Sequence, residues 1–368
     1  MIVGVPKEIK THEYRVGMTP HSVKAYVKNG HTVLVENGAG VGSGYEDAEY
    51  VAAGGRMVSE KADLFRKAEM IVKVKEPLPQ EYGLFREGQL LYTYLHLAAS
   101  KELATELLKR KVTGVAYETI ELPDRSLPCL TPMSEIAGRL SVQEGAKYLE
   151  KEFGGRGILL GGVPGVQRGT VSILGGGIVG TNACKIAVGI GANVTVLDIN
   201  AKRLAYLDDI FGSSITTLYA TEANVEAVLR VSDIVIGAVL VAGETAPRLI
   251  TKQHLSIMQP GAVIVDVAID QGGCAETSRP TTHDDPIYIV DGVVHYCVAN
   301  MPGAVARSST IALTSVTLQY GLMIAGMGLK AAAHANDAVR KGINTIDGKL
   351  VHAGVARSTG LPFAEYAA

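Results

Sequence analysis

The sequence has few cysteines and no block of charge of either sign. Its 35 basic and 37 acidic residues give a net charge of −2, so nothing points to nucleic acid or an anionic membrane as a partner. The four cysteines are widely spaced and contain no C-x-x-C pair, which argues against a disulfide framework or a zinc site. We therefore expect buried thiols in a reducing cytoplasm.

Signals for export, membrane crossing or metal binding are also missing. The opening MIVGVPKEIK has no long apolar core and no cleavage signature, so no signal peptide is expected. The most apolar long stretch, Thr310–Ala333, contains Gln319, hydroxyl residues and several glycines, which favours a buried or interface helix over a membrane span. No His, Cys or Glu spacing suggests a metal site, and no G-x-S-x-G nucleophile motif occurs.

Length and residue pattern predict two α/β domains. A chain of 368 residues, 47% hydrophobic and 20% charged, is too long for one core of ordinary size. Apolar strand-like segments alternate with helical ones, as in parallel sheets with helices on both faces. We expect two Rossmann-like doubly wound parallel-sheet domains, separated by a cleft and linked by long helices. One would comprise residues 1–128 and 307–368, and the other residues 129–306.

Some elements are predicted in more detail. A helix is expected from Thr131 to about Phe153, followed by a hairpin or linker over Gly154–Val166. The second domain is expected to have six strands, with a final strand pair over Ile287–Val298, and a helix over Thr251–Met258. After Asn300 only helices are expected, and these would return to the first domain.

The stretch Thr170–Asp198 has the order of a dinucleotide-binding unit. A short apolar strand leads into Gly175, Gly177 and Gly180, spaced as G-x-G-x-x-G. A helix over Ile178–Gly189 and a second strand ending in Asp198 are expected to follow. The first glycine permits a tight turn, the second lets the backbone approach a pyrophosphate, and the third lets helix and strand pack closely. Asp198 can accept hydrogen bonds from ribose hydroxyls and repels a 2′-phosphate, so NAD is favoured over NADP.

Three polar residues of the first domain follow the ends of apolar strands. These are Arg15, Lys75 and His96, and ligands of open parallel sheets bind outside the carboxyl ends of the strands. Arginine can bind a carboxylate with two hydrogen bonds, lysine can polarise a carbonyl, and histidine can move protons near neutral pH. Together they predict a site for a small oxo or amino acid, although each alone is also compatible with a surface or core role. Lys73 is expected to be a solvated residue at its strand end.

The second domain contributes polar groups to the same kind of edge. Asp270 lies three residues past a strand in VIVDVAIDQGGC, where its loop is expected to reach the nicotinamide end of the cofactor. Asp266 is closer to the strand and is expected to be structural. The segment ANMPGAV adds Asn300 and Met301 as expected cofactor contacts.

Longer motifs connect the chain to a known family. Over essentially its whole length the sequence resembles the alanine dehydrogenase family, which also includes the NAD-binding part of proton-pumping transhydrogenase. The resemblance is carried by GVPKEIK (Gly4–Lys10), VKVKEPLP (Val72–Pro79), YLHLA (Tyr94–Ala98), TPMSEIAGR (Thr131–Arg139), LLGGVPGV (Leu159–Val166), DQGGCAETSRPTTH (Asp270–His283) and NMPGAV (Asn300–Val305).

The resemblance implies reversible oxidative deamination of L-alanine to pyruvate and ammonia with NAD, in a cytoplasmic homohexamer. It implies that Arg15 and Lys75 bind substrate in the domain of residues 1–128 and 307–368, and that His96 and Asp270 transfer protons. Residues 129–306 would bind NAD. The implied cofactor contacts are Ser134, Gly175, Gly177, Ile178, Val179, Gly180, Asp198, Arg203, Ala220, Val239, Leu240, Val267, Ala268, Ile269, Asp270, Arg279, Val298, Ala299, Asn300 and Met301.

Three positions depart from the family pattern. Gly17 stands where many relatives have alanine, Ala306 replaces a usual proline, and Ala220 lacks a hydroxyl that some relatives have. None of them is a predicted proton-transfer group. Two alternatives stay open: a related amino-acid dehydrogenase of other specificity, or the NAD-binding subunit of a transhydrogenase with a membrane partner. A non-catalytic NAD sensor would not need the four substrate and acid–base residues together.

Overall fold

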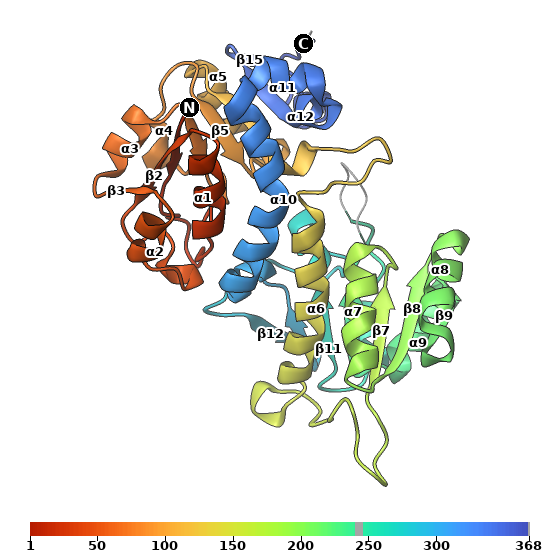
Figure 1. The fold of residues 1–368 in the computed structure, drawn as a ribbon. Helices are drawn as coiled ribbons and strands as arrows, with labels where there is room; N and C mark the ends of the chain where they lie inside the picture. Colours follow the sequence, from red (N-terminus) through yellow and green to blue (C-terminus); the bar gives the residue numbers. More distant parts are fainter. Residues whose placement is uncertain (240–245, 367–368) are drawn as a thin grey trace. The chain divides into compact units, whose positions relative to one another are not determined.

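The computed structural model describes residues 1–239 and 246–366, which divide into two compact units (Figure 1). Unit 1 comprises Met1–Met133 and Gly303–Ala368, and unit 2 comprises Ser134–Pro302. Each unit is built on one mostly parallel β-sheet. The prediction of two parallel-sheet α/β domains is therefore confirmed.

Unit 1 contains an eight-stranded sheet in the order β15-β14-β6-β5-β4-β1-β2-β3. The strands β1 to β6 are parallel, whereas β14 pairs antiparallel with β6, and β15 with β14. Because β6, β5, β4 and β1 are adjacent and parallel, the segments that follow them emerge at one edge. The strands are β1 (Ile2–Val5), β2 (Thr32–Glu36), β3 (Arg56–Val58), β4 (Met70–Val72), β5 (Leu90–Thr93), β6 (Thr113–Ala116), β14 (Ile343–Ile346) and β15 (Lys349–Leu350).

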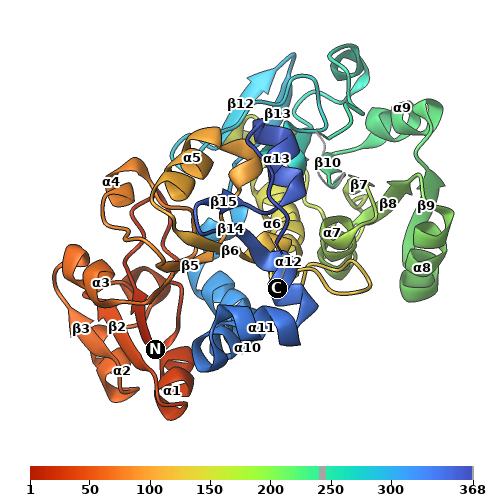
Figure 2. The same cartoon turned by 90° about the horizontal axis from the view of Figure 1, so that it is seen from above.

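The C-terminal strands correct one expectation. Only helices were expected after Asn300, yet β14 lies beside β6 (Figure 2). Helices cover the sheet, and Leu64, Phe65, Ile71 and Leu91 are among its fully buried core residues. The helices of unit 1 are α1 (Pro20–Lys28), α2 (Asp47–Ala52), α3 (Lys61–Lys67), α4 (Pro79–Tyr82), α5 (Lys101–Lys109), α10 (Ala306–Met327), α11 (Leu329–Ala335), α12 (Asp337–Gly342) and α13 (Ala353–Thr359), with 3-10 turns η1 (Val41–Ser43), η2 (Leu97–Ala99) and η3 (Tyr117–Thr119).

The long helix α10 belongs to the packing of unit 1. The stretch Met301–Met327 has the length and mean hydropathy, 1.3, of a helix able to cross a membrane, and 44% of its most apolar window is buried. Thr310 accepts the Val16 N–H through Oγ1 at 3.2 Å, and the Tyr92 hydroxyl donates to the Thr317 carbonyl at 3.0 Å. A core helix of a globular protein passes the same test of length and composition.

Unit 2 contains a seven-stranded sheet in the order β12-β13-β11-β10-β7-β8-β9. All neighbours are parallel except β12 and β13. The strand pair expected over Ile287–Val298 is present: its two strands turn back at Asp291 and Gly292, both with positive φ, and pair antiparallel. The expected total of six strands is wrong, because the sheet of the described residues contains seven. The strands are β7 (Thr170–Leu174), β8 (Asn193–Asp198), β9 (Ile215–Tyr219), β10 (Ile234–Gly237), β11 (Val263–Asp266), β12 (Ile287–Val290) and β13 (Val293–Tyr296).

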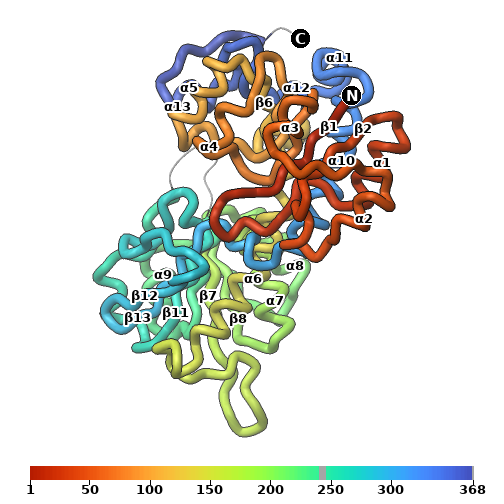
Figure 3. Tube along the Cα trace, turned by 90° about the vertical axis from the view of Figure 1, so that its left-hand side faces the viewer, coloured from red at the N-terminus to blue at the C-terminus, as the bar shows by residue number. Residues whose placement is uncertain are grey.

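Several predicted elements of unit 2 differ in detail. The predicted helix over Thr251–Met258 is a 3-10 turn, and the helix starting at Thr131 ends at Tyr148. The segment after it projects from unit 2 as a hairpin, closed by a hydrogen bond from Gly169 N–H to the Leu160 carbonyl at 2.9 Å (Figure 3). The helices are α6 (Thr131–Tyr148), α7 (Ile178–Gly189), α8 (Ala201–Phe211) and α9 (Glu222–Val231), with 3-10 turns η4 (Lys151–Phe153), η5 (Gly212–Ser214), η6 (Gln253–Ile257), η7 (Val267–Gln271) and η8 (Met301–Val305).

All four cysteines are free and buried, as expected: Cys129, Cys184, Cys274 and Cys297. Burial raises the pKa of the thiol to about 12 at Cys184 and to about 11 at Cys297. At neutral pH these side chains are therefore protonated, and they pack as small apolar groups.

Candidate active site

The two predicted substrate-binding residues and the predicted proton-transfer residue His96 follow three neighbouring strands of unit 1. Arg15 lies after β1, Lys75 after β4 and His96 after β5, and these strands are adjacent in the order β5-β4-β1. Since the strands are parallel, all three segments leave the sheet at its carboxyl edge. The sheet therefore places at one edge three residues that lie up to 81 positions apart in the sequence (96 minus 15).

Arg15 is buried, with 2% of its surface exposed, and it forms a two-pronged ion pair with Glu13. Its Nε donates to Glu13 Oε1 at 2.7 Å and its Nη2 to Oε2 at 2.5 Å. Burial by itself would lower the pKa of Arg15, but the bonds and charge of Glu13 raise it. Nη1 donates to the Met133 thioether at 3.1 Å. The thioether sulfur is a weaker acceptor than the Glu13 carboxylate.

Lys75 is half-buried, and its backbone is fixed on both sides. Its N–H donates to Glu8 Oε1 at 3.3 Å, and its carbonyl accepts the Thr93 hydroxyl at 3.1 Å. The expectation for Lys73 is wrong: its side chain is 0% exposed, and it pairs with Glu8 and Glu81. All three residues of β4 are buried, and Lys73, which directly follows the strand, is shielded from solvent as well.

His96 is exposed and starts the turn η2. Its backbone is left-handed, with φ 48° and ψ 35°, and its ring stacks on Tyr94 with centroids 5.7 Å apart. The Glu118 carboxylate accepts the His96 N–H at 2.6 Å and the Leu95 N–H at 3.2 Å. An exposed imidazole on a fixed backbone can exchange protons with solvent and with a bound substrate.

Three carboxylates of this site were missed from the sequence. Glu8, Glu13 and Glu118 hold backbone or arginine groups of the predicted residues. Glu118 follows β6, so the strand-end rule could have found it. Nothing in the sequence marks Glu8 or Glu13 as buried. Glu8 bonds Lys73 and Lys75, 65 and 67 residues along the chain, and Arg15, the partner of Glu13, is close in sequence but becomes buried only in the fold.

In unit 2 the predicted glycine turn joins β7 to α7. Gly175 has φ 104°, which disfavours any side chain, and Gly177 caps α7. A Cβ on Gly180 would overlap the carbonyl oxygen of Gly175. Gly175 and Gly180 therefore let the strand, turn and helix approach closely, whereas a Cβ on Gly177 would meet nothing within 4 Å. A pyrophosphate cradle at a helix N-terminus requires both this close packing and an accessible backbone. These residues fit a bound dinucleotide.

Asp198 ends β8 and accepts two backbone N–H groups. Gly176 N–H donates to Oδ2 at 2.7 Å and Asn200 N–H to Oδ1 at 2.8 Å. Arg203 lies over the same turn, where it donates to the Gly176 carbonyl and to the Thr181 hydroxyl. One carboxylate thus ties the glycine turn to the end of β8, the position expected for a ribose contact.

The other implied cofactor positions follow the remaining parallel strands. Ala220 follows β9, Val239 follows β10, the turn η7 follows β11, and the segment from Val298 to Met301 follows β13. Ser134 is on α6, one turn before Gly138, whose Cβ position meets the Val179 carbonyl at the start of α7. Arg279 stacks on the Tyr288 ring at 4.0 Å. Leu240 lies outside the described residues.

Asp270 is exposed within η7, and Asp266 is buried at the end of β11. Asp266 Oδ2 accepts the Cys274 N–H at 2.8 Å and the Ala275 N–H at 3.3 Å, as well as the Ser278 hydroxyl at 2.5 Å. It thereby closes the loop that carries Asp270, which agrees with a structural role. Among the described residues, no group of three or more His, Cys, Asp and Glu could hold a metal ion.

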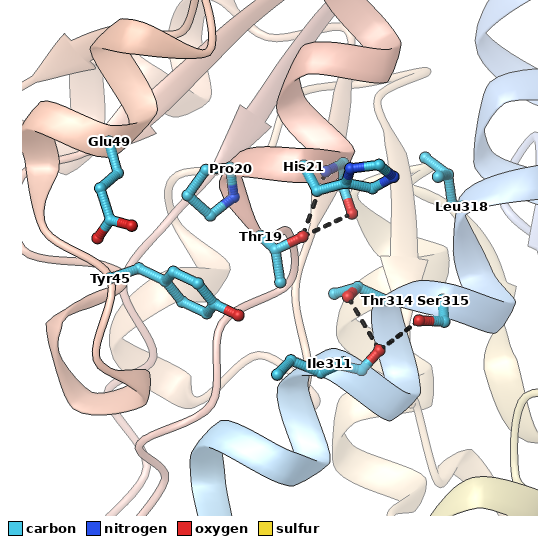
Figure 4. A pocket seen from close by; sticks show the side chains of 10 residues that line it. Thr19, Pro20, His21, Tyr45, Glu49, Ile311, Thr314, Ser315 and Leu318 are labelled. Atoms are coloured by element: carbon cyan, nitrogen blue, oxygen red, sulfur yellow. Dashed lines mark hydrogen bonds between the residues drawn. The ribbon is translucent and has the colours of Figure 1, made fainter.

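A cavity of about 450 Å³ lies elsewhere in unit 1, between the start of α1, Tyr45, Glu49 of α2 and one face of α10 (Figure 4). Thr19 and Ser22 on its wall already bond to each other. Arg15, Lys75 and His96 do not line it. The carboxyl edge of the sheet, and not this cavity, is therefore the candidate site.

The two sheets, each with polar groups after its parallel strands, define a two-domain α/β enzyme of the Rossmann class. Family models describe the relationship more closely: residues 4–137 match the N-terminal domain of alanine dehydrogenase/PNT, and residues 141–353 match its C-terminal domain. The chain belongs to the alanine dehydrogenase/PNT family, whose members are oxidoreductases.

Individual relatives are similar along their whole length. The chain is 57% identical to an alanine dehydrogenase of Methanococcus maripaludis, covering 99% of this chain and 98% of that one. It is 56% identical to that of Staphylococcus haemolyticus, covering 99% and 97%. A solved L-alanine dehydrogenase superposes with a TM-score of 0.95 at 54% identity, covering 98% and 99%. A transhydrogenase of Sinorhizobium meliloti gives 0.82 at 26%, covering 96% and 99%.

Proposed function

We propose that this protein is an L-alanine dehydrogenase, which interconverts L-alanine, NAD and water with pyruvate, ammonia, NADH and a proton. The observation that carries the proposal is that Arg15, Lys75 and His96 follow three adjacent strands in a chain 57% identical to an alanine dehydrogenase. The transhydrogenase alternative is not favoured, because identity to that class is 26%.

In the proposed reaction, unit 1 binds the substrate. Arg15 binds the carboxylate of pyruvate, and the Lys75 ammonium polarises the carbonyl. His96 moves protons as ammonia adds to the carbonyl carbon and as the resulting carbinolamine loses water to give the imine. Asp270 is proposed as the second acid–base group. Holding the reactants in place supplies much of the rate enhancement.

Unit 2 is proposed to hold the cofactor. The glycine turn would receive the pyrophosphate and Asp198 the ribose hydroxyls, with further contacts at the positions named above from Ser134 to Met301. When bound, NADH supplies the hydride that reduces the imine. The Asp198 carboxylate, held by two backbone N–H groups, would repel a 2′-phosphate, which supports NAD over NADP.

The assay that tests this function compares NADH oxidation with pyruvate plus ammonia against pyruvate alone. Turnover that requires ammonia is expected. Turnover without ammonia would identify a hydroxy-acid dehydrogenase instead. A panel of oxo acids and amino acids, including lysine, tests the alternative specificity. Discrimination against one methylene is limited to about 1–3 kcal/mol, so slow activity on glyoxylate and 2-oxobutyrate is expected.

The role of His96 is tested by His96→Ala. If His96 is the proton shuttle, kcat falls by about 10²- to 10⁴-fold, while NADH binding is unchanged. Wild-type turnover at every pH would exclude the role.

A cytoplasmic homohexamer acting without nucleic acid or membrane is also proposed from the family resemblance. Sedimentation of the purified protein measures the number of subunits.

A further inference from the structure

A buried ion cluster lies directly beneath the segment that carries Lys75. Lys73 Nζ donates to Glu8 Oε2 and to Glu81 Oε1, each at 3.1 Å. The three side chains are 0%, 2% and 1% exposed. Lys61, on α3, also approaches Glu81 at 3.4 Å. Burying charges is costly unless each has a partner, so this cluster persists because its members neutralise one another.

The second carboxylate oxygen of Glu8, which takes no part in the ion pair, accepts two backbone N–H groups. Glu8 Oε1 accepts the Val74 N–H at 2.6 Å and the Lys75 N–H at 3.3 Å. On the other side the Thr93 hydroxyl holds the Lys75 carbonyl. Glu8 follows β1 and Thr93 ends β5, so both neighbours of β4 fix the backbone at Lys75.

Charge strengthens this arrangement. Burial raises the pKa of Glu8, and the Lys73 ammonium opposes that rise and favours the carboxylate. A carboxylate accepts N–H groups more strongly than a neutral acid or amide does. Lys73 thus supports the bonds that Glu8 makes to the next two residues of the chain.

We propose that Glu8 is a positioning residue, which together with Lys73 fixes the backbone at Lys75 and so directs the Lys75 ammonium toward the substrate carbonyl. This inference rests on the substrate role proposed for Lys75. If the cluster has a purely structural role, replacing either of its glutamates changes KM for pyruvate equally. If Glu8 positions Lys75, KM for pyruvate changes only when the Lys75 N–H loses its acceptor.

Glu81 is the matched control for this distinction. It is as buried as Glu8 and bonds the same Lys73 nitrogen at the same distance. Its other oxygen accepts the Leu78 N–H at 3.2 Å, and Glu81 itself lies in α4. Glu81→Gln therefore disturbs the ion cluster but leaves the acceptor of the Lys75 N–H in place.

The experiment measures KM for pyruvate and for NADH in the full-length wild type, Glu8→Ala, Glu8→Gln and Glu81→Gln. Loss of one directed contact, about 1.4 kcal/mol, corresponds to a rise of about tenfold, which we expect in KM for pyruvate with Glu8→Ala. A smaller rise is expected with Glu8→Gln, which keeps one acceptor oxygen. KM for NADH stays unchanged in all three, and Glu81→Gln leaves KM for pyruvate within about twofold.

Equal rises in KM for pyruvate with Glu8→Gln and Glu81→Gln would overturn the proposal, as would a parallel rise in KM for NADH. If Glu8→Ala does not fold, the comparison of the two glutamine variants decides. Amide hydrogen exchange without substrate gives a readout independent of activity. Faster exchange at Val74 and Lys75 is expected in the Glu8 variants and not in Glu81→Gln, and unchanged exchange would contradict the contact itself. A wild type inactive with pyruvate and ammonia would instead refute the proposed function.

Discussion

His96 is held in a left-handed backbone conformation, which costs a residue with a Cβ on the order of 1 kcal/mol. The Glu118 carboxylate maintains it by accepting the N–H groups of Leu95 and His96. Removing this acceptor lets the segment relax and moves the imidazole. We expect Glu118→Ala to lower kcat about 10- to 100-fold with a smaller change in KM, measured by NADH oxidation with pyruvate and ammonia. Glu118→Gln, which keeps an acceptor oxygen, should show a smaller fall in kcat.

The control for this prediction is another glutamate of the same loop. Glu121 pairs with Lys341 at 2.9 Å, and its side chain is 32% exposed. Exposed pairs contribute about 0–1 kcal/mol, so Glu121→Ala should leave kcat within about twofold of wild type. Equal losses of kcat in the two alanine variants would show that Glu118 acts on general stability and not on His96.

At the residue level, the sheet edge at which a side chain lies could be predicted where a rule of topology applied. Arg15, Lys75 and His96 were placed at one sheet edge because each follows a parallel strand, a relation visible in the sequence. Prediction failed at Lys73, because β4 is buried on both faces and the period-two pattern that separates inward from outward residues is absent. The roles of Glu8 and Glu118 depend on backbone N–H groups more than 20 residues away, and no local pattern encodes such contacts.

Among the elements, the β7–α7 turn has the tightest geometry. A Cβ on Gly180 would overlap the Gly175 carbonyl oxygen, a backbone atom that cannot rotate away. Overpacking of this kind typically costs about 1–3 kcal/mol and shifts the backbone. We expect Gly180→Ala to widen the turn and to weaken NADH binding by at least about tenfold, equivalent to about 1.4 kcal/mol. Titration of NADH fluorescence measures this change.

Gly189 offers the comparison within the same helix. It is the last residue of α7, and a Cβ there would meet nothing within 4 Å. Alanine favours a helix over glycine by about 0.5–1 kcal/mol, so Gly189→Ala should keep NADH affinity and match or exceed the wild-type unfolding temperature. Weakened binding in both variants would argue against a specific role of the turn.

Helices and strands could be predicted where the signal that specifies them lies within their own sequence. The helix Ile178–Gly189 was placed at its observed bounds, because glycines mark its start and an apolar pattern runs along it. The short strands β14 and β15 were missed, since they form only by pairing with β6 and with each other. The 3-10 turn η6 was predicted as an α-helix, since its apolar spacing does not distinguish i→i+3 from i→i+4 bonding.

At the scale of the whole molecule, each unit has its own buried core, and each contains a histidine whose pKa is lowered by burial. In unit 2, His295 is 0% exposed. Its Nδ1 is 3.0 Å from the Val293 carbonyl and its Nε2 is 2.8 Å from the Thr277 hydroxyl. A carbonyl only accepts, so Nδ1 carries the proton and Nε2 accepts from Thr277. The neutral ring satisfies both contacts, whereas a second proton would remove the acceptor.

This arrangement makes the folded protein sensitive to mild acid. Burial lowers the pKa of His295 below its usual 6.5, and burial does the same for His352 in unit 1. Below about pH 6.5 the unfolded chain therefore binds protons that the folded chain does not, so stability falls as the pH falls toward the folded-state pKa. Each such group contributes up to about 1.4 kcal/mol per pH unit in this window.

We expect the wild-type unfolding temperature to drop between about pH 7.5 and 5.5, and His295→Gln to show a drop smaller by roughly 2–6 °C, since one titrating group is removed. The variant is less stable than wild type at the upper pH, because glutamine fills the site less well. Its unfolding temperature nevertheless changes less steeply with pH. His334→Gln, at an exposed position of α11, should keep the wild-type slope. The same slope in wild type and His295→Gln would show that other groups set the acid limit, and His352 would then be the next residue to replace.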